Sequence, residues 1–378
     1  MPAAPGNFLP IRLPERPPCF LGRLAQTRFD SLEATLKPIP LPLTPSGGAY
    51  DVTALHNFAA LRGQLRVSFT PQCNALCWFC HNEGDVPPPE THRDRSHKPR
   101  ERRFDSGAFL RTITSLMEAG LKRVYFTGGE PLVSRWARPV LKQLPPSTPD
   151  STYTLITNGL LVRRNQEWLA QTPLDKIKVS LHYFSDESLM EIARVPQGIG
   201  AILDGIEAAR EVVPRVELNT LLQRQNEHEI EAILDYALER RLPVQLIELV
   251  DTDYNQSGSS AAVSAEGAIR YLRNLTSDEH TEIAGVGQGR RVFRVDGVEI
   301  DVIHRDLGRH HVGQCGTCPV RPKCVEGFWA LRIDHAGGLQ PCLLRDDLRM
   351  DLSRHLDEPH ALTAAVARHI AAFTEGTL

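Results

Sequence analysis

The feature that most limits the fold of this sequence is a regular alternation between residues 61 and 250. Short runs rich in β-branched and aromatic residues alternate with segments whose apolar residues recur at helical spacing. Six such runs predict βαβ units, a parallel sheet and right-handed crossovers. The expected strands are Leu65–Thr70, Val124–Thr127, Tyr153–Thr157, Ile177–Leu181, Val216–Leu222 and Val244–Leu249.

Six βα units are too few to close an eight-stranded barrel, so we predict an α/β fold built on a partial (β/α)6 TIM barrel. One helix should begin with Asp105 or Ser106 as its cap and stop at Gly120. Further helices are expected near 160–170, 186–194, 199–212 and 227–240. The expected parts are an N-terminal extension (1–60), the barrel (61–250), a linker (251–310), a small cluster-binding unit (311–350) and a helical tail (351–378).

Seven of the eight cysteines fall into two groups, and Cys19 stands alone. The proline-rich N-terminus lacks the apolar core of a secretory signal, and no apolar run approaches the roughly 18 residues of a membrane span. We therefore expect a cytoplasmic protein, in which disulfides are rare and grouped thiols bind metals or iron–sulfur clusters. The net charge of −3 argues against nucleic-acid and membrane-surface partners.

The first group, Cys73, Cys77 and Cys80, follows the first expected strand with the spacing C-x3-C-x2-C. A structural zinc site usually has four ligands and C-x2-C pairs, which this spacing fits poorly. A [4Fe–4S] cluster has four irons, so three thiolates leave one iron open to another ligand. The spacing therefore favours a [4Fe–4S] cluster with an open iron.

This group, together with Phe79 and the turn Thr127-Gly-Gly-Glu-Pro131, resembles the radical S-adenosylmethionine (SAM) superfamily. The resemblance implies that the open iron binds SAM and that one electron then cleaves SAM to a 5′-deoxyadenosyl radical. Glycines allow close approach of a ligand, and the glutamate would accept a hydrogen bond from the SAM ammonium. The implied SAM contacts are Phe79, Gly128, Gly129, Glu130, Thr157, Asn158 and Ser180. His182 stands where the superfamily often has Asp.

The second group of cysteines lies near the C-terminus. Cys315 and Cys318 form a C-x2-C pair, and Cys342 follows a turn that contains Gly337. Four thiolates would suit zinc, but the layout also resembles the C-terminal auxiliary [4Fe–4S] cluster that radical SAM enzymes often carry, and we favour that cluster. Cys324 lies between the pair and Cys342, and we expect it to be a fourth ligand that closes the cluster.

The chain also resembles the GTP 3′,8-cyclase (MoaA) family over roughly residues 56–350. The similarity is carried by the strand with Arg66-Val-Ser, the GGEP turn, the run Gln245-Leu-Ile-Glu248 and the segment Gly338-Leu-Gln-Pro-Cys342-Leu. The resemblance implies a partial TIM barrel and a cluster held by three cysteines, best matched by Cys315, Cys318 and Cys342. Such a cluster would leave an iron open to the substrate.

Several basic positions of that family have changed in this chain. Tyr125 and Phe126 occupy the stretch where a basic residue usually precedes the GGEP turn, Glu217 replaces a lysine, and Gln245 and Ala330 replace arginines. Each charge-assisted contact is worth roughly 1.5–3 kcal/mol, so these losses argue against a triphosphate. The remaining candidate contacts to a carboxylate or a single phosphate, with structural ion pairs as the alternative, are Arg66 and Arg332.

We therefore expect a radical SAM enzyme that abstracts a carbon-bound hydrogen from a small polar substrate or a peptide in a biosynthetic pathway. Cyclisation, epimerisation, oxidation or decarboxylation would follow. The alternatives are a GTP 3′,8-cyclase and a non-catalytic iron–sulfur or zinc scaffold. The expected electron donor is a flavodoxin or a ferredoxin. The sequence identifies no catalytic acid, base or radical relay.

Overall fold

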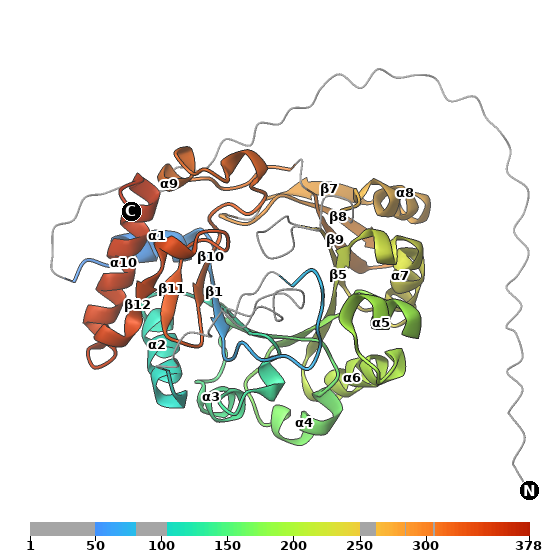
Figure 1. The fold of residues 1–378 in the computed structure, drawn as a ribbon, viewed down its shortest axis with the longest axis horizontal. Helices are drawn as coiled ribbons and strands as arrows, with labels where there is room; N and C mark the ends of the chain where they lie inside the picture. The colour runs from blue at the N-terminus through green and yellow to red at the C-terminus, as the bar shows by residue number, and fades with distance from the viewer. Residues whose placement is uncertain (1–49, 81–103, 250–261, 284, 305–306) are drawn as a thin grey trace, which may run out of the picture. The chain divides into compact units, whose positions relative to one another are not determined.

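Parallel strands β1 to β6 lie side by side in chain order in the computed structural model, which describes residues 50–80, 104–249, 262–283, 285–304 and 307–378. Each expected strand is present within two residues of its expected ends, and Figure 1 shows the strands enclosed by helices. The partial-barrel prediction is confirmed. The strands are β1 (Gln64–Ser68), β2 (Arg123–Thr127), β3 (Thr152–Thr157), β4 (Lys176–Ser180), β5 (Arg215–Leu222) and β6 (Val244–Glu248).

The expected helices between the strands are present, and their first member shows why. Helix α2 (Ser106–Glu118) begins at Asp105, whose side chain accepts a 2.8 Å hydrogen bond from Ala108 N, and Gly120 follows its end with a φ of 103°. Helix α3 (Ala137–Gln143) was not expected, because it is short and contains Pro139 in its first turn. The other helices are α4 (Val162–Leu169), α5 (Asp186–Ala193), α6 (Ile199–Val212) and α7 (Ile230–Glu239).

Residues 251–310 are not a simple linker, which corrects the sequence analysis. Their described part contains a helix and three strands that extend the barrel sheet, because β9 pairs in parallel with β6 and β8 pairs with both β9 and β7. Asp296 (φ 48°) and Gly297 (φ 79°) form a tight hairpin between β8 and β9. The elements are α8 (Glu266–Leu275), β7 (Glu279–Glu282), β8 (Arg290–Val295) and β9 (Val298–Ile303).

The C-terminal cysteine segment is joined to the barrel through a strand. Strand β10 (Ala330–Ile333) pairs in parallel with β1 and places Arg332 opposite Arg66. Strands β11 (Gly338–Gln340) and β12 (Met350–Asp351) continue the sheet beyond β10. The expected cluster-binding unit is therefore one edge of the same twelve-stranded sheet.

The expected helical tail contains α10 (Pro359–Glu375), which contacts both α1 (Thr53–Ala60) and α2. The ring of Phe328 lies 4.8 Å from the ring of Phe58 and 4.9 Å from that of Phe373. The last part of the expected N-terminal extension thus forms a helix on the barrel, whereas residues 1–49, with Cys19, lie outside the described residues. No helix in the described part of the chain has the length and apolar character to cross a membrane.

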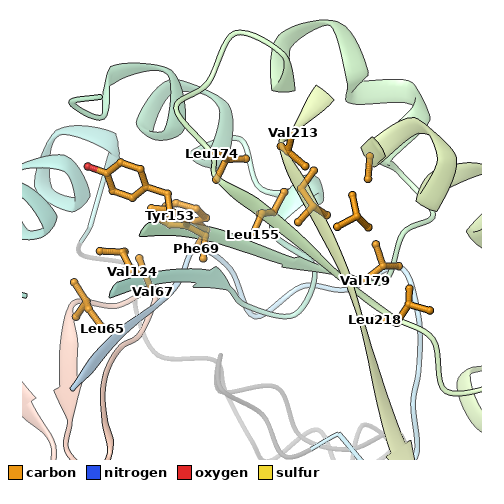
Figure 2. Close-up of a cluster of buried hydrophobic side chains, with 14 of the residues drawn as sticks. Leu65, Val67, Phe69, Val124, Tyr153, Leu155, Leu174, Val179, Val213 and Leu218 are labelled. Carbon is orange, nitrogen blue, oxygen red and sulfur yellow. The ribbon is translucent and has the colours of Figure 1, made fainter. Parts of the chain in front are cut away.

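The core lies between the strands and the surrounding helices, and it leaves the other face of the strands for the site. Leu65, Val67 and Val124 are fully buried on the helix side, where Figure 2 shows them with neighbouring residues of β3 to β5. Alternate residues of a strand point to opposite faces, so Gln64 and Arg66 face the barrel interior.

Candidate active site

A cavity of about 630 Å³ occupies the interior of the barrel. Its lining contains all three cysteines of the first group, both candidate substrate arginines and all seven residues expected to contact SAM. The cysteines follow the carboxyl end of β1, and the GGEP turn follows that of β2. The carboxyl ends of the strands are where parallel α/β folds place their catalytic residues. The lining residues expected from the sequence are Arg66, Cys73, Cys77, Phe79, Cys80, Gly128, Gly129, Glu130, Thr157, Asn158, Ser180 and Arg332.

The two glycines of the GGEP turn hold it directly against the cysteine loop. Gly129 N donates to the Thr70 carbonyl at 2.7 Å, and Glu130 N donates to the Gln72 carbonyl at 2.8 Å. A Cβ on Gly129 would lie 2.2 Å from the Gln72 oxygen, and one on Gly128 would lie 2.7 Å from the Thr70 oxygen. The glycines are therefore needed for the close packing of two backbones, a role that the sequence analysis did not foresee.

Two cysteines of the first group, Cys73 and Cys77, lie in surroundings that keep a bare thiol neutral. Burial raises the pKa of Cys73 to about 12, with Glu130 and Cys80 adding to the effect, and burial raises that of Cys77 well above its usual value. The Cys73 sulfur accepts hydrogen bonds from Ala75 N (3.4 Å) and from Asn158 Nδ2 (3.8 Å). Thiolates here need a metal to balance their charge.

The donor set suits an iron–sulfur cluster. Cys73, Cys77 and Cys80 line one cavity. In a [4Fe–4S] cluster each thiolate binds a different iron, so three cysteines leave one iron open to another ligand. Within the described ranges, no group of three His, Cys, Asp or Glu side chains that could hold a single metal ion is found.

Glu130 is fixed by three donors from two elements. Its Oε1 accepts from Leu132 N (3.0 Å) and from the Thr157 hydroxyl (2.8 Å), and its Oε2 accepts from Asn158 N (2.8 Å). The side chain is only 1% exposed, and this burial raises its pKa to about 7 despite the three hydrogen bonds. A cation beside Glu130 would favour its ionised form.

The strand end of β4 contributes a histidine that the sequence analysis had noted only as a departure. Ser180 is the last residue of β4, and both it and His182 line the cavity. His182 Nδ1 accepts a 3.0 Å hydrogen bond from Leu221 N, and its ring meets that of Phe79 edge to face at 5.0 Å. Burial lowers the pKa of His182 to about 4, so the ring is neutral.

The four cysteines of the second group converge on a smaller cavity beside the first. Cys315, Cys318, Cys324 and Cys342 all line it. Burial raises the pKa of Cys315, and it raises that of Cys342 to about 11. Arg345 lines the same cavity and donates from a terminal guanidinium nitrogen to the Cys318 sulfur at 3.4 Å.

A buried ion pair lines the large cavity and lies near Cys342 of the small one. Arg332 donates to Glu326 Oε2 at 3.2 Å, and Trp329 Nε1 donates to the same oxygen at 3.0 Å. The guanidinium of Arg66 lies 5.8 Å from the Tyr125 ring centre and 5.6 Å from that of Trp329. Arg332 thus has the structural ion pair that the sequence analysis left open.

The amino end of the barrel is basic, which the comparison of family positions had missed. Arg123, Lys176 and Arg215 are the first residues of β2, β4 and β5, and all line the cavity. Glu217 contacts Lys176 (2.5 Å), Arg215 (3.0 Å) and Lys178 (3.3 Å). Burial opposes ionisation of Glu217, but these cations outweigh it and lower its pKa to about 2. Lys176, Lys178 and Arg215 therefore outnumber the one carboxylate that all three contact.

Arg62 and Arg123 form a like-charged pair at this end. Burial, and then the charges of Arg62 and Arg290, lower the pKa of Arg123. Arg290 is paired with Asp301 and Glu282, whereas neither Arg62 nor Arg123 has an ion pair among the residues that the structure describes. An anion bound between them would relieve their repulsion.

Comparison with known proteins agrees with this site. Residues 67–237 match the sequence model of the Radical SAM superfamily. These residues, a little under half of the chain, therefore carry a radical SAM domain, and the match implies an enzyme with a [4Fe–4S] cluster and SAM as cofactors.

Among curated relatives, it is 29% identical over 296 residues to a "Probable GTP 3',8-cyclase" of Methanocella arvoryzae, covering 75% of this chain and 82% of that protein. It is 26% identical over 320 residues to the GTP 3',8-cyclase of Rhodopirellula baltica, covering 81% and 83%. The chain is thus similar to these cyclases at a distance that a divergent paralogue would show.

Two solved structures share the fold. Streptococcus suis SuiB bound to S-adenosylmethionine superposes with a TM-score of 0.51 at 13% identity, covering 79% of this chain and 63% of SuiB. The chain therefore spans less than two thirds of the length of SuiB. The structure described as native anSMEcpe with bound AdoMet gives a TM-score of 0.52 at 14% identity and covers 82% of each chain.

Proposed function

We propose that this enzyme abstracts a carbon-bound hydrogen from a small anionic substrate held inside the barrel. The observation that carries the proposal is a single cavity inside the barrel. The cysteines and the GGEP turn line it at the carboxyl ends of the strands, and basic residues line it at their amino ends. The cluster and SAM supply the 5′-deoxyadenosyl radical, so the chain's own residues bind, orient and exclude water. A flavodoxin or a ferredoxin would supply the electron.

The first cysteine group would hold the cluster, and the surrounding residues would orient SAM. Glu130 is the proposed acceptor for the SAM ammonium, because its carboxylate is buried and already oriented by Leu132, Thr157 and Asn158. Asn158 links this carboxylate to Cys73 through its backbone and side chain. Cluster and SAM amino group would therefore share one rigid support. Further SAM contacts are proposed at Phe79, Gly128, Gly129 and Ser180.

The anionic character of the substrate is inferred from charge and size. Arg62 and Arg123 repel each other at the amino end of the cavity, and a bound phosphate or carboxylate would stabilise both. A cavity of about 630 Å³ is within the size range of small-molecule sites. We therefore favour a small molecule over a peptide. Arg66 lies in the same cavity and is a further candidate contact.

We also propose that the second cysteine group holds an auxiliary [4Fe–4S] cluster closed by Cys324. The support is that all four thiols line one small cavity, with no described cysteine of the group left outside it. Four thiolates would leave no iron open to substrate. The substrate would then be bound by side chains of the barrel.

A GTP 3′,8-cyclase is the second candidate function. It is favoured by the 26–29% identity to cyclases over more than two thirds of the chain. The basic amino end of the barrel also offers partners for a triphosphate, in place of the family positions that have changed. The charge of Glu217 and the proposed closure by Cys324 argue against it.

Iron content and GTP turnover test these proposals. Anaerobic reconstitution should give about eight irons per chain, that is, two [4Fe–4S] clusters. Replacing Cys315, Cys318, Cys324 and Cys342 with alanine should halve the iron and leave SAM binding intact. Iron content that does not change contradicts the second cluster. Tight GTP binding with formation of a cyclised product would replace the first proposal with the second candidate.

A further inference from the structure

Glu326 is a buried carboxylate in the wall of the large cavity. The residue is 6% exposed and lies four positions before β10. Its Oε2 accepts hydrogen bonds from Trp329 Nε1 at 3.0 Å and from Arg332 at 3.2 Å. A buried charge is tolerated only with partners of this kind. Glu326 and Arg332 therefore form a fixed pair in the cavity wall.

Two arginines share the surroundings of this carboxylate. Strand β10 places Arg332 opposite Arg66 of β1, and both residues line the cavity. The guanidinium carbon of Arg66 lies 5.6 Å from the ring centre of Trp329, and that of Arg332 lies 5.1 Å from it. The indole that Glu326 holds is thus close to both guanidinium groups. The two arginines and the one glutamate together carry one net positive charge.

The charge of this group of three side chains selects among anions. A carboxylate carries one negative charge, which matches the one net positive charge. A phosphate group carries about −1.5 to −2 charge near pH 7, and a chain of phosphates carries more. The additional charge would come close to the Glu326 carboxylate, and like charges at short range repel each other. Binding sites gain specificity from such a repulsive element as well as from attractive contacts.

We propose that Glu326 determines the specificity of the substrate site by favouring a single carboxylate over a polyphosphate at Arg66 and Arg332. This inference rests on the proposed function, in which the substrate is a small anion, and it names a carboxylic acid as the substrate class. Glu326 is a positioning residue, because it acts by holding Arg332 and balancing its charge.

Three variants of the cluster-loaded protein test the inference. Glu326→Gln removes the negative charge and keeps an oxygen that can accept from Trp329. The double variant Glu326→Gln, Arg332→Gln removes both members of the pair. Glu299→Gln is the matched control, because Glu299 also lines the cavity but pairs with Arg294, at 3.7 Å.

The measurement is the ratio of two affinities, for inorganic tripolyphosphate and for acetate, obtained by calorimetry. We expect Glu326→Gln to shift this ratio about tenfold toward tripolyphosphate, because Arg332 becomes available to further phosphate oxygens. The double variant should lose this gain. Glu299→Gln should shift the ratio by less than about twofold, because the charge of a more exposed ion pair is screened by water.

The outcomes separate this inference from the proposed function. An unchanged ratio in Glu326→Gln, or an equal shift in Glu299→Gln, overturns the role of Glu326 alone. A loaded wild-type protein that binds neither anion, or that cyclises GTP, overturns the proposed function as well.

The stability of Glu326→Gln gives a second measurement. Removing one partner of a buried ion pair destabilises a protein, so the melting temperature of this variant should fall. Tripolyphosphate should then raise that temperature further than it raises the melting temperature of the wild type, because it supplies a new partner for Arg332. A smaller or equal rise contradicts the inference.

Discussion

At the scale of single residues, the proposed contact between Glu130 and the SAM ammonium would make SAM binding depend on pH. Its pKa of about 7 lies above the usual 4.5, so the unliganded folded protein takes up a proton that the unfolded chain does not hold between these values. The stability that the neutral carboxyl contributes is therefore lost as pH rises through this window. A bound ammonium reverses the preference and favours the carboxylate.

We therefore expect SAM affinity to fall as pH drops below about 7, by up to about tenfold per pH unit. The measurement is the dissociation constant of SAM between about pH 6 and 8. Glu130→Gln should bind SAM weakly at all these values, with a flat profile. A wild-type profile as flat as that of the variant would contradict the role of Glu130.

Arg345 provides a second test at this scale. Two nitrogens of its guanidinium donate to the two carboxylate oxygens of Asp347, at 2.7 and 2.6 Å. This pairing directs the third nitrogen to the Cys318 sulfur. Hydrogen bonds to cluster sulfurs set reduction potentials. Arg345→Gln should lower the potential of the proposed auxiliary cluster in a redox titration followed by electron paramagnetic resonance. Exposed Arg354→Gln is the control, and equal potentials in both variants would refute the effect.

At the scale of elements, we expect the stability of the fold and the first cluster to depend on the contact between the GGEP turn and the cysteine loop. Gly129→Ala would place a methyl group 2.2 Å from the Gln72 oxygen. We expect a loss of about 1–3 kcal/mol in the free energy of unfolding. The turn and the loop should also separate, which lowers the iron content of the first cluster.

The matched control is Gly200→Ala in α6, where nothing lies within 4 Å of the added Cβ. Alanine is favoured over glycine in a helix, so this variant should keep or slightly raise the melting temperature. The measurements are thermal denaturation and iron analysis of the Gly129→Ala and Gly200→Ala proteins. Equal iron content in the two proteins would show that the glycine contact is not needed for the cluster.

The sequence predicted the elements that have a local signal. The β1–β6 strands followed from runs rich in β-branched and aromatic residues, and α2 followed from its Asp105 cap. The hairpin of β8 and β9 had a signal in Asp296-Gly297, which was overlooked inside an irregular stretch. The pairing of β10 with β1 had no local signal in the sequence, because the register between residues as distant as Arg66 and Arg332 depends on the folded sheet.

The candidate site was predictable where a motif marks it and unpredictable where charges meet across strands. The cysteines were found from their spacing, and the turn with Glu130 was found from its resemblance to the radical SAM superfamily. The shared position of Arg123, Lys176 and Arg215 at the starts of their strands could have been noticed. That Glu217 is surrounded by cations could not, since it requires the strand register.

At the scale of the whole molecule, the basic amino end of the barrel should bind anions. The double variant Arg62→Gln, Arg123→Gln removes two charge-assisted contacts, each worth about 1.5–3 kcal/mol. We expect its affinity for inorganic pyrophosphate, measured by calorimetry, to fall by more than tenfold. Arg210→Gln on the exposed face of α6 is the control. Equal affinity in both variants would contradict an anionic substrate.

The central claim is that Cys73, Cys77 and Cys80 hold the cluster that cleaves SAM. The most direct measurement is 5′-deoxyadenosine released from SAM by the reduced, anaerobically reconstituted protein. The account predicts release by the wild type and none by the Cys73→Ala, Cys77→Ala, Cys80→Ala protein, which should still keep its second cluster. Release by the triple variant, or none by the fully loaded wild type, would contradict the account.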